Sequence, residues 1–93
     1  MTSEVKASHI LVETEQEALD LYNKINAGLT FEEAAIKNSL CPSAQNGGDL
    51  GFFSRGMMVK PFEEAAFNLE TGELSKPVQT QFGWHLILVT DKK

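Results

Sequence analysis

The chain has 93 residues, which suits a single domain over residues 1–93 with a modest core and leaves no room for a second domain. Its net charge of -5, from 13 acidic and 8 basic residues, argues against a nucleic-acid footprint and against docking on an anionic membrane surface. No apolar run approaches the length of a transmembrane span, so we expect protein partners rather than nucleic acid or membranes.

The first half of the chain predicts one strand followed by two helices. Val5–Val12 is rich in apolar and β-branched residues with partial alternation, which predicts a strand. Thr14–Glu17 forms a capping box, and apolar residues then recur at helical spacing up to a stop at Gly28. Thr30–Glu33 forms a second box, which opens a helix that runs through Lys37.

After the second helix the chain turns irregular and is rich in turn-forming residues, up to a short strand at Leu50–Phe53. Pro61 suits the first turn of a third helix. Pro77-Val78 marks a possible short strand, and Trp84–Thr90 predicts the final one. The order predicts an α+β fold in which the first and last strands, the longest, pair in the middle of a mainly antiparallel sheet.

Four segments in chain order then carry a family pattern. They are residues 7–12 (ASHILV), 48–53 with 55–63 (GDLGFF and RGMMVKPFE), 71–78 (TGELSKPV) and 82–87 (FGWHLI). With this order and spacing, the sequence resembles the parvulin-type peptidyl-prolyl cis/trans isomerases over essentially its whole length. The resemblance implies a four-stranded antiparallel sheet surrounded by helices. It also implies rotation about the peptide bond before proline, without a cofactor.

The resemblance implies an apolar cup for the proline ring, made by Leu50, Met58 and Phe62; we call these three residues the proline cup. From pattern alone the same three residues fit an ordinary core, since Leu, Met and Phe are usually buried. Met57 precedes Met58, so the pocket methionine is uncertain by one position. Phe82, where some phosphate-directed parvulins have serine, is expected to extend the apolar wall, although plain packing at a turn is the simpler interpretation.

The resemblance also implies a polar cluster of His9, Cys41, Thr80 and His85. A histidine set among apolar residues is usually a satisfied core residue, but two on neighbouring strands can hydrogen-bond and hold each other's tautomers. We therefore expect both histidines to orient the site rather than to exchange protons. Cys41 is expected to be a polarisable group near the substrate carbonyl, because isomerisation needs no covalent intermediate. No close-spaced ligand pair occurs among these residues, so we expect no metal.

The segment after the first strand bears on the substrate. Phosphate-directed parvulins carry a basic cluster there, whereas residues 13–17 of this chain read ETEQE. Acidic side chains repel a phosphate, so we do not expect phosphoserine selectivity, and basic or apolar residues before proline look more compatible. The expected partners are proline-containing peptides and unfolded or folding proteins, bound by a monomer.

Two other functions stay open. A parvulin-like domain without catalytic activity would hold extended segments as a chaperone does, although the intact set of cup and cluster residues argues against this. A hydrolase would use Cys41 as nucleophile with His9 or His85, but no known cysteine-hydrolase motif surrounds Cys41.

The N-terminal sequence bears on the location. Residues 1–6 lack the basic start and apolar stretch of a signal peptide. If Met1 is the native start, we expect a cytoplasmic protein. If the chain was cut from a larger secreted foldase, we expect an extracytoplasmic location.

Overall fold

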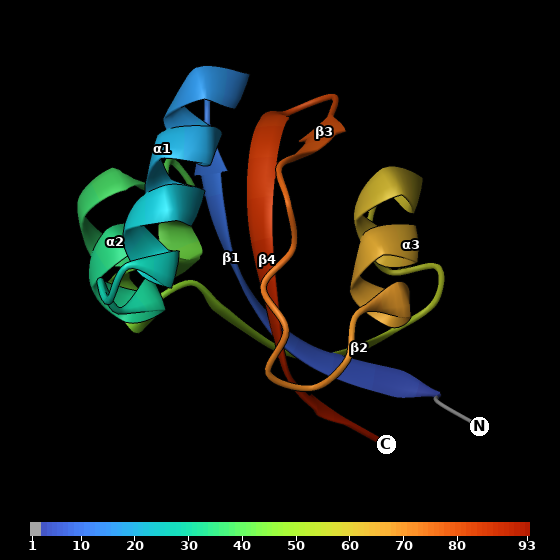
Figure 1. Ribbon diagram of the computed structural model, residues 1–93. Coiled ribbons are helices and arrows are strands. Elements are labelled where there is room, and N and C mark those ends of the chain that lie inside the picture. Colours follow the sequence, from blue (N-terminus) through green and yellow to red (C-terminus); the bar gives the residue numbers. More distant parts are fainter. Residues whose placement is uncertain (1–2) are drawn as a thin grey trace.

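The computed structural model describes residues 3–93, which form a four-stranded antiparallel sheet flanked by helices (Figure 1). The strand order is β2-β1-β4-β3. The strands are β1 (Glu4–Val12), β2 (Asp49–Ser54), β3 (Val78–Thr80) and β4 (Gly83–Lys92). The helices are α1 (Glu15–Asn26), α2 (Phe31–Asn38), the 3-10 helix η1 (Pro42–Asn46) and α3 (Lys60–Asn68). The predicted α+β fold, with the first and last strands at the centre of the sheet, is confirmed.

The two predicted helix starts are confirmed by their caps. The hydroxyl oxygen of Thr14 accepts a hydrogen bond from the backbone N–H of Glu17 at 3.2 Å. Thr30 caps α2 in the same way, accepting from the N–H of Glu33 at 3.2 Å. Each cap satisfies one of the N–H groups that the first turn of a helix leaves without an intrahelical partner.

The segment after α2 is more regular than predicted. Residues 42–46 form η1, which begins at Pro42 and ends at Gly47 in the left-handed conformation, with φ of 69°. Proline suits the first turn of a helix and glycine suits its end, so these two residues frame a helical turn as well as a loop. The prediction of an irregular segment there was therefore wrong, because turn-forming residues alone do not distinguish the two.

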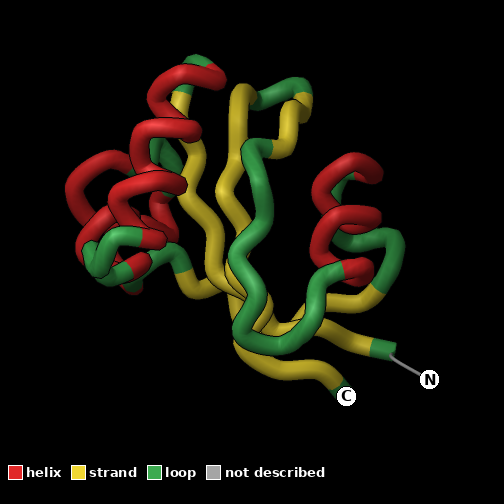
Figure 2. The backbone as a smooth tube through the Cα atoms, in the orientation of Figure 1, coloured by secondary structure: helices red, strands yellow, loops and turns green. Residues whose placement is uncertain are grey.

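The helices cover opposite faces of the sheet, α1 and α2 on one side and α3 on the other (Figures 1 and 2). Alternation along β1 and β4 supplies a separate core to each face. The core under α3 contains Val5, Ala7, Phe53, Phe62, Ala66, Phe67, Leu69, Ile87 and Val89. The core under α1 and α2 contains Ile10, Val12, Ala18, Leu21, Phe31, Ala34, Ala35 and Leu86.

The first and last residues of the described part of the chain, Ser3 and Lys93, lie side by side at one end of the sheet (Figure 1). The backbone N–H groups of Ser3 and Glu4 donate to the carbonyl oxygen of Lys93 at 2.8 and 2.9 Å. The opposite end of the sheet, where β1 ends and β4 begins, carries both histidines. Among residues 3–93, no helix is long and apolar enough to cross a membrane.

Gly48 holds the segment before β2 directly against β1. Its φ is +85°, its carbonyl oxygen accepts from the N–H of His9 at 2.9 Å, and a Cβ at this position would overlap the carbonyl oxygen of His9. His9 is fixed by its pairing with β4, and Gly48 is held by its backbone hydrogen bonds to His9 and Ser43, so neither can move away easily. Glycine is required here both for its conformation and for its lack of a side chain.

We expect Gly48→Ala to lower the free energy of unfolding by about 3 kcal/mol or more, because it adds a clash to an unfavourable φ. Gly51→Ala is the matched control: φ there is +70°, but a Cβ would meet nothing within 4 Å. Conformational strain alone should cost about 1–2 kcal/mol at Gly51. Urea unfolding of both variants measures the difference, and equal losses would contradict the close approach at Gly48.

Candidate active site

A cavity of about 520 Å³ opens on the α3 face of the sheet, at the end that carries both histidines. Its size is within the usual range for ligand pockets. The lining is almost entirely apolar. It consists of His9, Leu11, Leu40, Cys41, Pro42, Leu50, Met57, Met58, Val59, Phe62, Phe82 and His85.

Seven of the eight residues predicted from the sequence line this cavity together. They are His9, Cys41, Leu50, Met58, Phe62, Phe82 and His85. Thr80, the eighth, is not in the lining but bonds to His85 from behind. Sequence reasoning missed five lining residues, Leu11, Leu40, Pro42, Met57 and Val59. Leu11, Met57 and Val59 lie within the family segments, and Leu40 and Pro42 flank Cys41. These positions are the signals that the sequence offers for them.

The proline cup is made by side chains that also belong to the core. Phe62 on α3 is only 3% exposed and directs its ring at both histidines, with centroid distances of 5.4 Å to His9 and 5.2 Å to His85. Leu50 and Met58 are half-buried and pack against the core under α3. These residues therefore serve as both core and cup: one side of each side chain packs against the core, and the other side lines the cavity.

The histidine pair is set by the register of the central strands. His9 pairs with Ile87 across the sheet and His85 pairs with Leu11, so the two histidines lie diagonally on one face. Their rings stack with centroids 5.2 Å apart and planes 17° apart. Their Nδ1 atoms are 3.0 Å apart, within hydrogen-bond distance. The predicted contact between the two side chains is present.

Burial keeps both imidazoles uncharged at neutral pH. His9 is 6% exposed and His85 is 4% exposed. Desolvation, with a smaller contribution from His85, lowers the pKa of His9 to about 4, and desolvation lowers the pKa of His85 to about 4. Because one proton must lie between the two Nδ1 atoms, one ring donates it and the other accepts it.

Thr80 decides which ring donates. Its hydroxyl oxygen accepts from the backbone N–H of Phe82 at 3.1 Å and lies 2.8 Å from Nε2 of His85. If the hydroxyl donates to Nε2, its proton is satisfied, and His85 must then carry its own proton on Nδ1 and donate it to His9. The reverse order would leave the hydroxyl proton without a partner among the described residues. Hydrogen-bond satisfaction therefore favours the chain Thr80 to His85 to His9.

This order leaves His9 with its proton on Nε2. That atom is buried and has no hydrogen-bond partner among residues 3–93. An unmade hydrogen bond of this kind costs about 1–3 kcal/mol. Such costs are concentrated at functional sites, so the orphaned Nε2 of a cavity-lining residue marks His9 as a candidate contact for a ligand.

Cys41 stands at the cavity beside the end of β1. Its neighbour Leu40 donates its backbone N–H to the carbonyl oxygen of Leu11 at 2.8 Å, which holds this segment to the strand. Within the described part of the chain, no hydrogen bond joins Cys41 to either histidine. The base required by a cysteine nucleophile is therefore not in place. Residues 3–93 also contain no group of three His, Cys, Asp or Glu that could hold a metal ion.

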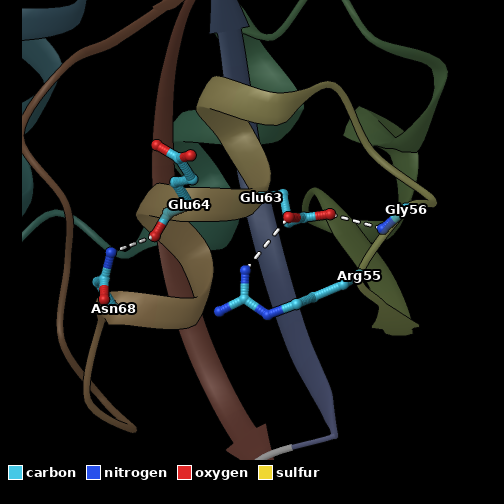
Figure 3. Close-up of polar contacts among 5 residues, drawn as sticks. All are labelled: Arg55, Gly56, Glu63, Glu64 and Asn68. Carbon is cyan, nitrogen blue, oxygen red and sulfur yellow. Dashed lines mark hydrogen bonds and ion pairs between the residues drawn. The ribbon is translucent and has the colours of Figure 1, made fainter.

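The segment that carries Met57 and Met58 is tied to α3 by one carboxylate (Figure 3). Glu63, in the first turn of α3, accepts from the backbone N–H of Gly56 and pairs with the guanidinium of Arg55 at 3.2 Å. A carboxylate is favourable near the start of a helix, and this one also restrains the segment before the helix. The two methionines are thus presented from a restrained segment.

A model of the PPIC-type PPIase domain matches residues 1–93. The foldase protein PrsA of Halalkalibacterium halodurans is 55% identical over 91 residues, which cover 97% of this chain and 27% of that protein. The chain spans about a quarter to a third of the length of its PrsA relatives.

Solved structures show the same fold in a longer and in a short protein. The crystal structure of the peptidylprolyl isomerase PrsA from Bacillus anthracis aligns with a TM-score of 0.97 and 46% identity, over 99% of this chain and 43% of that one. NmPin, the parvulin of Nitrosopumilus maritimus, aligns with a TM-score of 0.88 and 43% identity, over 98% of this chain and 99% of that one. With a family model along its length and relatives of both kinds, the chain belongs to the PPIC-type, or parvulin, family of peptidyl-prolyl isomerase domains.

Proposed function

We propose that this chain catalyses cis/trans isomerisation of X–Pro bonds in polypeptide substrates, with the ring held by Leu50, Met58 and Phe62. The observation that carries the proposal is an apolar cavity whose floor is a buried, uncharged histidine pair. Family membership supports the same reaction. The eight residues predicted from the sequence are proposed as the site.

The reaction needs preferential binding of a twisted amide and no bond cleavage. Uncatalysed rotation is slow because amide resonance sets a barrier of about 18–20 kcal/mol. A planar amide carries more charge on its oxygen than a twisted one, so a cavity that strips water raises the planar state relative to the twisted state. The apolar cup supplies this effect, and an acceleration of a thousandfold requires only about 4 kcal/mol.

The polar groups then act by orientation. Thr80 fixes the proton order of the histidine pair, and His9 presents an Nε2–H group that can donate to a substrate oxygen without reorganisation. Cys41 contributes a polarisable thiol at the cavity wall. These roles need no change of protonation during turnover, so the low pKa values of the histidines suit them.

Phosphate-directed activity is not part of the proposal. The cavity lining contains no Lys or Arg. The segment between β1 and α1 and the first turn of α1 carry Glu13, Glu15 and Glu17, which oppose a phosphate group. A phosphate before proline would therefore lose hydration without gaining a cation in return.

We further propose that residues 1–93 act as one monomeric domain on proline-containing peptides and on unfolded or folding proteins. The relatives support protein substrates, since one is named a foldase and another is named a peptidylprolyl isomerase. They comprise both a short parvulin and long foldases, so the cytoplasmic and the extracytoplasmic location both stay predictions.

The central test is cis-to-trans exchange in an Ala-Pro peptide, followed by NMR exchange spectroscopy with a catalytic amount of protein. We expect faster exchange with the peptide intact. Met58→Ala should lower kcat/KM by about tenfold, because it removes part of the apolar cup. Leu19→Ala, at an exposed position on α1 outside the cavity, is the control and should leave the rate unchanged.

Two results would reject the proposal. Unchanged exchange with several residues before proline, in protein shown to be folded, would favour a binding module without catalytic activity. Cleavage of the peptide would instead restore Cys41 as a nucleophile.

Thr80→Val tests the proton order in the histidine pair. The valine keeps the shape but leaves Nε2 of His85 and the N–H of Phe82 without their partner, so we expect slower exchange and a loss of stability of about 1–3 kcal/mol. Thr80→Ser keeps the hydroxyl group, so this variant should retain both the exchange rate and the stability. Imidazole ¹⁵N chemical shifts provide an independent measurement: they should report Nδ1–H for His85 and Nε2–H for His9, and the opposite tautomers would refute the assignment.

The low pKa values predict a defined pH dependence. Unfolded histidine has a pKa of about 6.5, so between pH 6.5 and 4 the unfolded state binds more protons than the folded state. The contribution of the neutral histidines to the free energy of unfolding is therefore fully present above pH 6.5. It decreases as the pH falls, by up to about 2 kcal/mol per histidine at pH 5. Urea unfolding at pH 7, 6 and 5 measures this loss, which His85→Asn should reduce.

The same low pKa values predict that kcat/KM of the isomerase does not change between pH 6 and 8, because both histidine rings stay neutral there. An inflection of kcat/KM near pH 6.5 would show that a histidine titrates in the working enzyme and would contradict the orienting role.

A further inference from the structure

We propose that Leu40, Met57 and Phe82 form a specificity rim at the mouth of the cavity, which selects substrates with large apolar residues beside the proline. The proposal rests on the proposed isomerase function and names its substrate class. That class is an unfolded polypeptide segment in which an uncharged, apolar side chain adjoins proline.

The first observation is where exposed apolar side chains gather. Among residues 3–93, the large hydrophobic side chains exposed to solvent are Leu19, Ile36, Leu40, Met57 and Phe82. The last three line one cavity, and they are 58%, 65% and 61% exposed. Single exposed hydrophobic residues are ordinary, but a cluster around a cavity mouth is typical of a binding surface. The rim therefore has exposed apolar area that a bound polypeptide can cover.

The second observation is the absence of charge. No Asp, Glu, Lys or Arg lines the cavity, and its two histidines are neutral at pH 7. A charged residue beside the proline would lose water without meeting an opposite charge. An apolar residue would instead exchange water for rim contacts, with a gain that grows with the area buried. Of the basic or apolar neighbours compatible with the sequence, the cavity favours the apolar ones.

The third observation is that the rim has two parts, which come from different segments of the chain. Leu40 and Gly83, the residue after Phe82, both adjoin Leu11 near the end of β1. The N–H of Leu40 donates to the Leu11 carbonyl oxygen, and a Cβ on Gly83 would lie 3.3 Å from Leu11 Cδ1. We call Leu40 and Phe82 the strand part of the rim.

Met57 forms the other part, on the segment before α3. Its thioether sulfur accepts from the N–H of Ser54 at 3.4 Å, and Glu63 holds the neighbouring Arg55 and Gly56 (Figure 3). The exposed side chain therefore rises from a restrained backbone. When the proline ring of a polypeptide lies in the cup, the residue on one side of proline contacts the strand part of the rim. The residue on the other side of proline contacts Met57.

The experiment uses NMR exchange spectroscopy on two peptide series, one varying the residue before proline and one varying the residue after it, each with Leu, Ala, Lys or Glu. We expect kcat/KM to be about tenfold higher for Leu than for Ala, and higher for Leu than for Lys or Glu. Leu40→Ser should lower the Leu-to-Ala ratio in one series, and Met57→Gln should lower it in the other. Ile36→Ser is the matched control, because it removes an equally exposed side chain outside the cavity and should leave both ratios unchanged.

The outcomes separate this proposal from the proposed function. No acceleration of any peptide would reject the isomerase itself. If the protein accelerates Leu and Ala peptides equally, the specificity rim is rejected but the isomerase function is not. The same conclusion follows if the preference for Leu persists in both rim variants. Sedimentation velocity tests another occupant: a concentration-dependent dimer that Leu40→Ser and Met57→Gln abolish would show that a second copy covers the rim, and would also overturn the proposal.

Discussion

The site depends on the antiparallel pairing of β1 with β4. This pairing joins the two ends of the chain into the centre of one sheet, and it sets His9 against Ile87 and His85 against Leu11. A shift by one residue would move each histidine to the opposite face, under α1 and α2. The register is fixed because both faces are buried, so a shift would exchange two cores at once. The position of the histidine pair is thus a consequence of core packing.

Core and site are difficult to separate in this small domain. Phe62 is almost fully buried and contributes to the core under α3, yet its ring contacts both histidines and lines the cavity. A chain of this size has few apolar residues to spare, so the inner surface of the cup is the outer layer of the core. This sharing makes the cup rigid, since movement of its wall would disturb close-packed side chains. It also explains why substitutions in the cup combine effects on stability and on binding.

Polar atoms at the site are arranged to keep charge out of the cavity. Burial keeps both imidazoles neutral, and the hydroxyl of Thr80 satisfies the one nitrogen of His85 that His9 does not. The remaining unsatisfied atom, Nε2 of His9, belongs to a residue of the cavity wall. A neutral, preorganised donor in apolar surroundings suits a reaction in which the polarity of an amide changes but no proton is transferred.

The sequence by itself determined the elements and the family. Local signals were sufficient for this: capping residues at Thr14 and Thr30 mark the helix starts, and alternating apolar residues mark the long strands. The sequence could not distinguish cup from core at Phe62, nor a helical turn from a loop at residues 42–46. Tertiary structure alone decided the diagonal, stacked geometry of the histidines, the place of Thr80 behind His85 and the exposure of Leu40 and Met57. These properties depend on contacts between residues far apart in the chain, whereas caps and alternation depend only on neighbours.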